Sequence, residues 1–146
     1  MSEAQFEHKI ESPREFILAG NSYFTAQSDK SKNHLTFKVT KCEDKEMFFV
    51  AVCNTYDGYM FIGNLYANIE RTSFNFVKSK KLKEDKDQLS IIVFKFIIDN
   101  YLLPGIVRTF PNTMTFYHHG KCGKCGRVLT TPESIKRGLG PFCASL

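Results

Sequence analysis

The sequence contains no long uninterrupted run of apolar residues. Its longest apolar stretch, residues 91–103, is interrupted by Lys95 and Asp99 and is shorter than the roughly 20 residues that a membrane-spanning helix needs. The first residues also lack the basic and then apolar pattern of a secretory signal. We therefore expect neither a membrane protein nor a secreted one, and we predict a cytoplasmic location with no membrane partner.

The sequence also lacks the even cysteine count of a disulfide framework and has no recognisable catalytic motif. Five cysteines, an odd number, in a chain without a secretory signal do not predict disulfides. Cys42 and Cys53 lie in apolar segments, where free cysteine packs as a small buried side chain. No glycine-rich phosphate loop, Gly-x-Ser-x-Gly or His-Glu-x-x-His motif is present. We therefore expect a protein that is not an enzyme, with a nuclease of unrecognised catalytic residues as the open alternative.

Aromatic residues, by contrast, are abundant and fall in strand-like segments. The 146 residues include 14 Phe and 6 Tyr but no Trp. Apolar and polar residues alternate in short segments separated by turn residues, which predicts an antiparallel sheet of about five to six strands. The predicted strands are residues 35–39, 47–53, 59–66, 73–78 and 107–117, with one more inside residues 15–26.

Residues 87–103 fit either a strand or a helix. Their Ile and Val content favours a strand, but their length and Asp87 as an N-cap favour a helix. Because apolar residues surround nearly the whole helix, we expect it to be buried. The predicted fold class is α+β, an antiparallel sheet packed by one long buried helix. A loose N-terminal arm (residues 1–14), a core domain (15–117) and a small C-terminal subdomain (118–146) complete the prediction.

The chain is mildly basic, and its excess of positive charge is concentrated in a few segments. Twenty Lys and Arg against fifteen Asp and Glu give a formal net charge of +5 and a pI of about 8.9. Most of the excess lies in residues 118–146, and a lysine run occupies residues 78–86. Basic clusters bind phosphate backbones, although a lysine run is more often only a solvated loop. The candidate nucleic-acid contacts are Lys78, Lys80, Lys81, Lys83, Lys121, Lys124, Arg127, Lys136 and Arg137.

The C-terminal segment has a cysteine pattern typical of structural zinc sites. Cys122 and Cys125 form Cys-x-x-Cys, and the following Gly126 suits a tight turn whose backbone N–H groups point at the sulfurs. Tetrahedral Zn²⁺ takes four nitrogen or sulfur ligands, so we predict Cys143 as the third ligand and His119 as the fourth. One structural Zn²⁺ would supply much of the folding free energy of this zinc-binding subdomain.

Other chemistries fit this segment less well. A thioredoxin-type redox pair opens a helix after a strand, whereas this pair lies among glycines. An iron–sulfur cluster prefers four cysteines, and a deaminase-type catalytic zinc needs His-x-Glu and a proline before the first cysteine. His118 is the alternative to His119 as the zinc ligand, and on an extended strand the two side chains point to opposite faces. Downstream, Thr131 and Pro132 predict the start of a helix over residues 132–137, and Gly138 predicts its end.

A dense series of residues in this segment forms a recognisable signature. It comprises His119, Gly120-Lys121-Cys122, Cys125-Gly126-Arg127, Leu129-Thr130, Pro132-Glu133-Ser134-Ile135, Gly138, Gly140-Pro141 and Cys143-Ala144. This series resembles the C-terminal signature of a family of small phage and prophage proteins, and residues 16–25 resemble that family's opening. The resemblance implies a phage origin, hence the host cytoplasm, and zinc ligands at His119, Cys122, Cys125 and Cys143. It implies no reaction, because no function is known for that family.

Two functions fit these features. The first is a zinc-binding accessory protein that binds nucleic acid, with single-stranded DNA or RNA favoured, because strands rich in aromatic and basic residues offer stacking platforms. Most aromatic side chains would fill the core, and the ones expected at the surface are Tyr23, Tyr56, Tyr59 and Tyr66. The alternative is a protein–protein module that binds and inhibits or diverts a host protein complex, such as a defence system, nuclease or polymerase. The oligomeric state is left open.

Overall fold

The computed structural model describes residues 8–54, 58–80, 85–104 and 114–140. Seven strands form one antiparallel sheet in the order β1-β7-β2-β3-β4-β5-β6. The strands are β1 (His8–Lys9), β2 (Asn21–Ser28), β3 (His34–Lys41), β4 (Met47–Asn54), β5 (Gly58–Ala67), β6 (Phe74–Lys78) and β7 (Met114–His118). The helices are α1 (Pro13–Ile17), α2 (Asp85–Ile97), its π-helical continuation η2 (Ile98–Leu102) and α3 (Pro132–Arg137).

The predicted antiparallel sheet is confirmed, and the α+β class is compatible with it, but the sheet has more strands than the five to six expected. Strands β2 to β6 follow one another as a meander, and β7 returns to pair with β2 on the other side. The additional strand is β1, where His8 pairs with His118 and Lys9 with Tyr117. This part of the predicted loose arm therefore belongs to the sheet. A strand of two residues is too short to produce an alternating pattern in the sequence.

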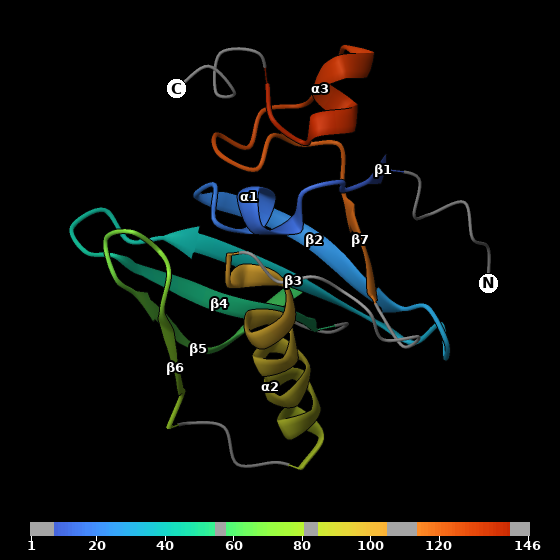
Figure 1. Ribbon diagram of the computed structural model, residues 1–146. Coiled ribbons are helices and arrows are strands. Elements are labelled where there is room, and N and C mark those ends of the chain that lie inside the picture. The colour runs from blue at the N-terminus through green and yellow to red at the C-terminus, as the bar shows by residue number, and fades with distance from the viewer. Residues whose placement is uncertain (1–7, 55–57, 81–84, 105–113, 141–146) are drawn as a thin grey trace.

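The core lies between the sheet and the helices that cover one of its faces, α1 and α2 (Figure 1). The ring of Phe94 on α2 packs against Phe37 and Phe76, with centroid distances of 5.5 and 5.4 Å. Phe24 continues this aromatic layer between Phe37 and Phe116. The expectation that most aromatic side chains fill the core therefore holds for this face of the sheet. In the described residues, no helix is long and apolar enough to cross a membrane.

Helix α2 differs from the sequence-based expectation of a helix that is buried on all sides. Ile91, Phe94 and Ile97 are buried against the sheet, but the opposite side of the helix is open. Leu89 is 57% exposed and Ile92 is 63% exposed. The physical reason is the two-layer architecture, because the sheet covers only one side of a helix and no second described layer covers the other.

A β-bulge between β4 and β5 sets the direction of the side chains that follow it. Val50 pairs with Gly63, and Ala51 pairs with Phe61, so Ile62 is the extra residue. On a regular strand, positions 61 and 64 would point to opposite faces. The bulge instead places both Phe61 and Asn64 opposite outward-facing residues of β4.

Arg71, in the turn between β5 and β6, ties that turn to two other segments. Its Nε donates to Oε2 of Glu46 at 3.1 Å, and its Nη1 donates to the carbonyl of Leu18 at 2.9 Å. The carbonyl of Arg71 in turn accepts a hydrogen bond from Arg14 of α1. The hydrogen bond from Arg71 is the main reason why the pKa of Glu46 lies below its usual value, and Lys41 acts in the same direction against the opposing effect of burial.

Candidate nucleic-acid interface and metal centre

The face of the sheet turned away from α1 and α2 carries the outward side chains of the strands (Figure 1). Strand pairing and the alternation of side chains identify its members. We call this surface the open face; its residues on β2 to β6 include Tyr23, Thr25, Thr36, Lys38, Thr40, Phe49, Ala51, Cys53, Tyr59, Phe61, Asn64, Tyr66, Asn75 and Val77. Cys53 is exposed there, which corrects the expectation that it is buried. Its position in an apolar segment did not reveal which face of the strand it occupies.

Tyr23 is the centre of an aromatic and basic cluster on the open face. The ring of Tyr59 meets the Tyr23 ring edge to face, with centroids 5.7 Å apart. The Nζ atoms of Lys38 and Lys121 lie 5.3 and 5.6 Å from the centroid of the Tyr23 ring, within cation–π range. Burial raises the pKa of Tyr59 above its ordinary value, with Cys53 and Tyr23 adding to the shift, so its phenol is neutral at pH 7.

A second aromatic pair lies on the same face. The rings of Phe49 and Phe61 are 6.4 Å apart, and their residues are 43% and 44% exposed. Tyr66 is also exposed, as expected from the sequence. Tyr23 and Tyr59 are half-buried, and Tyr56 lies outside the described residues. Large aromatic side chains left open to solvent on one face are typical of surfaces that contact other molecules.

The charge on the strands has one sign. None of the seven strands contains Asp or Glu. Glu43 and Glu46 lie in the connection between β3 and β4, outside the strands. An aromatic face whose strands carry lysine and histidine as their only ionisable basic residues suits an anionic partner.

His119 lies on this face, where it contacts a threonine of β2. Its Nε2 is 3.1 Å from Oγ1 of Thr25, which is itself 2.8 Å from Oγ1 of Thr36. Desolvation of the ring against the sheet is the main cause that lowers the pKa of His119. The nearby charges of Lys121 and His8 lower it further. The imidazole is therefore neutral at pH 7 and acts as a hydrogen-bonding group.

The Cys-x-x-Cys segment forms a tight turn of the kind expected for a zinc site. The backbone N–H of Gly126 donates to the carbonyl of Cys122 at 2.9 Å, and Gly126 has a φ of +81° that favours glycine. The Sγ of Cys122 accepts hydrogen bonds from the N–H groups of Lys124 and Gly140, both at 3.4 Å. Two such donors would stabilise a negatively charged sulfur, which is the form that binds metal. The backbone around Cys122 therefore suits a metal-binding thiolate, while Cys122 is buried and Cys125 is exposed.

His118, the alternative ligand, is engaged elsewhere. Its Nδ1 accepts the N–H of Gly120 at 3.0 Å, and its Nε2 lies 2.5 Å from the carbonyl of Ile135 in α3. The ring also stacks on His8 and on Phe16. Burial lowers the pKa of His118, against the opposing effect of the Ile135 hydrogen bond. Both ring nitrogens thus bind the backbone, and Nε2 ties the ring to α3.

The structure therefore brings together only part of the predicted metal site. Cys122 and Cys125 share one turn, whereas Cys143 lies outside the described residues. Over residues 8–54, 58–80, 85–104 and 114–140, no three His, Cys, Asp or Glu side chains are grouped as a metal site, so His119 is not grouped with the two cysteines. The short helix predicted downstream is confirmed as α3, with Thr131 accepting from the N–H of Ser134 and Gly138 in the left-handed region.

The predicted basic contacts do not all lie on the open face. Lys121 does, over Tyr23. Lys136 lies on α3 with its Nζ 3.9 Å from Glu11, and Lys81 and Lys83 lie outside the described residues. The other predicted contacts are exposed, namely Lys78, Lys80, Lys124, Arg127 and Arg137. Sequence reasoning missed Lys38, although its position between the inward-facing Phe37 and Val39 was a signal that it points outward.

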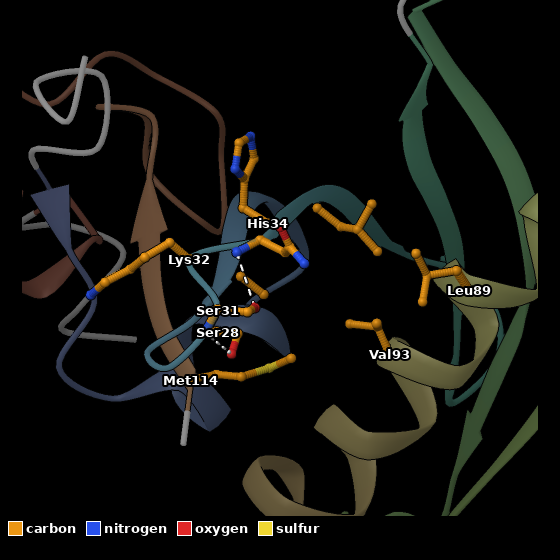
Figure 2. A pocket seen from close by; sticks show the side chains of 10 residues that line it. Ser28, Ser31, Lys32, His34, Leu89, Val93 and Met114 are labelled. Atoms are coloured by element: carbon orange, nitrogen blue, oxygen red, sulfur yellow. Dashed lines mark hydrogen bonds between the residues drawn. The ribbon is translucent and has the colours of Figure 1, made fainter. Parts of the chain in front are cut away.

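A pocket of about 570 Å³ lies on the helical side of the sheet, away from the open face (Figure 2). Ser28, Ser31 and Lys32 line it from the turn between β2 and β3, and Leu89 and Val93 line it from α2. The serine hydroxyls accept hydrogen bonds within the turn itself. Oγ of Ser28 accepts from the N–H of Ser31 at 3.3 Å, and Oγ of Ser31 accepts from the N–H of Asn33 at 3.2 Å. The pocket holds no cluster of catalytic side chains among its described residues.

Comparison with known proteins gives one match. Residues 113–146 match DUF6011, a family of unknown function. No curated protein and no solved structure matches the chain. The match covers β7, the cysteine turn and α3, and it leaves β1 to β6 outside.

Proposed function

We propose that the chain binds single-stranded nucleic acid on the open face of its sheet, without catalysis. The observation that carries the proposal is the cluster at Tyr23, where a tyrosine pair is flanked by the ammonium groups of Lys38 and Lys121. Bases stack on such rings without regard to sequence, while lysines meet the phosphates between them. The second pair, Phe49 and Phe61, offers another stacking position on the same face.

The energetics of this arrangement favour an unpaired strand over a duplex. Stacking of one base on an aromatic ring contributes about 1–3 kcal/mol, and it requires a base that is not already stacked between neighbours. The absence of acidic residues from all seven strands removes a source of repulsion toward the phosphates.

We further propose that the C-terminal segment holds one structural Zn²⁺ with Cys122, Cys125 and Cys143 as three of its four ligands. We also propose that the chain is phage-encoded, as the resemblance of this segment implies. The turn at Gly126 and the two N–H donors to Cys122 support the cysteine ligands. Bound zinc would hold the turn in place, next to Lys121. Elemental analysis of the purified chain should give one zinc per chain, and Cys122→Ser should remove it; an unmutated chain without zinc would contradict this part.

The binding proposal is tested with a fluorescently labelled single strand of mixed sequence, as DNA and as RNA, at low salt. Tyr23→Ala should raise the Kd by roughly fivefold or more, which corresponds to the loss of about one stacked base. Leu89→Ala is the matched control, because Leu89 is exposed on α2 on the other side of the sheet. A chain that retains no oligonucleotide at micromolar concentration, or equal losses in both variants, would refute the proposal.

A second function is favoured by the uncovered side of α2. Leu89, Ile92 and Phe96 are apolar and exposed at helical spacing, and Leu89 also lines the pocket beside the helix. Exposed apolar helix faces of this kind dock against protein partners, which fits a module that inhibits or diverts a host complex. Capture from nuclease-treated host lysate, lost in Ile92→Ser but kept in Tyr23→Ala, would support this function over nucleic-acid binding.

A further inference from the structure

The residues just before Cys122 point alternately to the two sides of the sheet. His118 is buried on the helical side, against Phe16. His119 contacts Thr25 on the open face, and Lys121 lies over Tyr23 on that same face. Cys122 is buried again. The chain thus passes from the open face to the cysteine turn within one residue.

This alternation bears on the metal site, because each of the two histidine rings is already engaged, and in a different way. Both ring nitrogens of His118 are engaged by backbone groups of Gly120 and Ile135. His119 has one nitrogen on Thr25, and it is not grouped with Cys122 and Cys125 in the described part of the chain. To ligate the metal, His119 would have to leave the sheet face and expose Thr25, which is 1% exposed beneath it.

We propose that His119, together with Lys121, is a contact residue of the nucleic-acid-binding face and is not a ligand of the metal. The inference rests on the proposed function for its binding half, but not for its metal half. His119 is neutral and hydrogen-bonds through Nε2 to a threonine, so Nδ1 is the nitrogen that would meet the polar edge of a base stacked beside it. Lys121, one residue from the cysteine turn, would meet a phosphate of the same strand.

The arrangement couples the metal turn to the binding face. Lys121 and Cys122 are adjacent, and the N–H of Cys122 donates to the carbonyl of Arg127 at 2.8 Å, which closes the turn. A metal that orders the turn therefore also fixes Lys121 over Tyr23 without touching the nucleic acid. Removal of the metal should weaken oligonucleotide binding to the extent that Lys121→Ala does.

The test measures zinc content and oligonucleotide Kd on the same full-length variants. His119→Ala should keep the zinc content of the unmutated chain while its Kd rises roughly three- to tenfold, the effect of losing one or two hydrogen bonds. Cys122→Ser should lose the zinc. Lys121→Ala should weaken binding more than Lys136→Ala, which removes the same charge from α3, where the side chain is 73% exposed.

The outcomes separate the two halves. Loss of zinc from His119→Ala would show that His119 is a ligand and would overturn the inference. If His119→Ala keeps both its zinc and an unchanged Kd, while Tyr23→Ala weakens binding, then His119 is not a contact residue of the nucleic-acid-binding face. If the unmutated chain binds zinc but no oligonucleotide, the proposed function fails, and the zinc content of His119→Ala still decides the ligand assignment. If Lys121→Ala and Lys136→Ala weaken binding equally, Lys121 contributes only its positive charge and makes no specific phosphate contact.

Discussion

A Cβ atom on Gly123 would lie 2.7 Å from Cε1 of Phe16, which is closer than two non-bonded carbon atoms approach. Gly138 stands against the same ring, where a Cβ would be 2.7 Å from Cδ1. The backbone completes the contact, because the N–H of Asn21 donates to the carbonyl of Gly123 at 2.7 Å. Phe16 of α1 thus fits into a slot in the cysteine segment, and this segment packs directly on the core.

The first prediction concerns this slot. Gly123→Ala should destabilise the protein by roughly 1–3 kcal/mol, because the added methyl group overpacks the Phe16 ring and the backbone must move to admit it. Urea unfolding measured by circular dichroism gives the free energy of unfolding.

Gly140→Ala is the matched control for this substitution. Among the described residues, no atom lies within 4 Å of a Cβ at Gly140, so we expect a change within about 0.5 kcal/mol. Similar stabilities for Gly123→Ala and Gly140→Ala would show that the segment is not packed on Phe16.

Removal of the metal should affect more than the C-terminal segment. Chelation or Cys122→Ser is expected to loosen residues 118–140 and to uncover Phe16 and the N–H of Asn21, while β3 to β6 keep their pairing. Hydrogen exchange should show faster exchange in residues 118–140 and at Asn21, with protection kept in β4 and β5. Loss of protection throughout the sheet would show that the core does not persist without the ordered segment.

The salt dependence of binding should report the phosphate contact of Lys38. For a single strand, each neutralised phosphate contributes about 0.7 to the slope of log K against log salt concentration. Lys38→Ala should therefore reduce the magnitude of the slope by about 0.7. Lys30→Ala, at an exposed position in the turn after β2, should leave it unchanged, and a smaller slope in both variants would speak against a defined phosphate site at Lys38.

The ion pair of Glu46 and Arg71 should contribute a pH-dependent part of the stability. The folded protein lowers the pKa of Glu46 below its ordinary value of 4.5, so the unfolded chain binds the proton first as the pH falls. The stabilisation is present above the unfolded pKa and is lost as the pH drops through the folded pKa. Because the side chains are about a third exposed, we expect roughly 1 kcal/mol or less.

Glu46→Gln tests this linkage against Glu43→Gln, an exposed neighbour. At pH 7, Glu46→Gln should be less stable than the unmutated chain, and the difference should shrink as the pH is lowered below about 4.5. A difference that stays constant over this range would mean that the carboxylate charge is not what stabilises the turn.

Local features of the chain were predictable because neighbouring residues produce them. Thr131, Pro132 and Gly138 mark the ends of α3 through capping and backbone preferences, and the alternation in residues 35–39 marks β3. The meander itself followed from closely spaced turn residues. The cysteine turn was equally local, because Cys122, Cys125 and Gly126 form it with their own backbone.

The orientation of each element depended on contacts between residues far apart in the chain. Helix α2 has two apolar stripes, and only the position of the sheet decided that Ile91 and Phe94 are buried while Ile92 is exposed. The bulge at Ile62 changed which aromatic residues of β5 face outward, and alternation along one strand does not reveal an added residue.

The sequence by itself determined that this protein has an antiparallel sheet, a capped C-terminal helix and a paired-cysteine turn, because capping, alternation and tight turns act over a few residues. Tertiary structure alone decided that Tyr23, Lys38, Thr25, His119 and Lys121 meet on one face. That meeting requires β7 to return beside β2, a pairing between segments about 90 positions apart. No local preference encodes such a pairing, which is selected by the burial of Phe24 and Phe116 on the other side of the sheet.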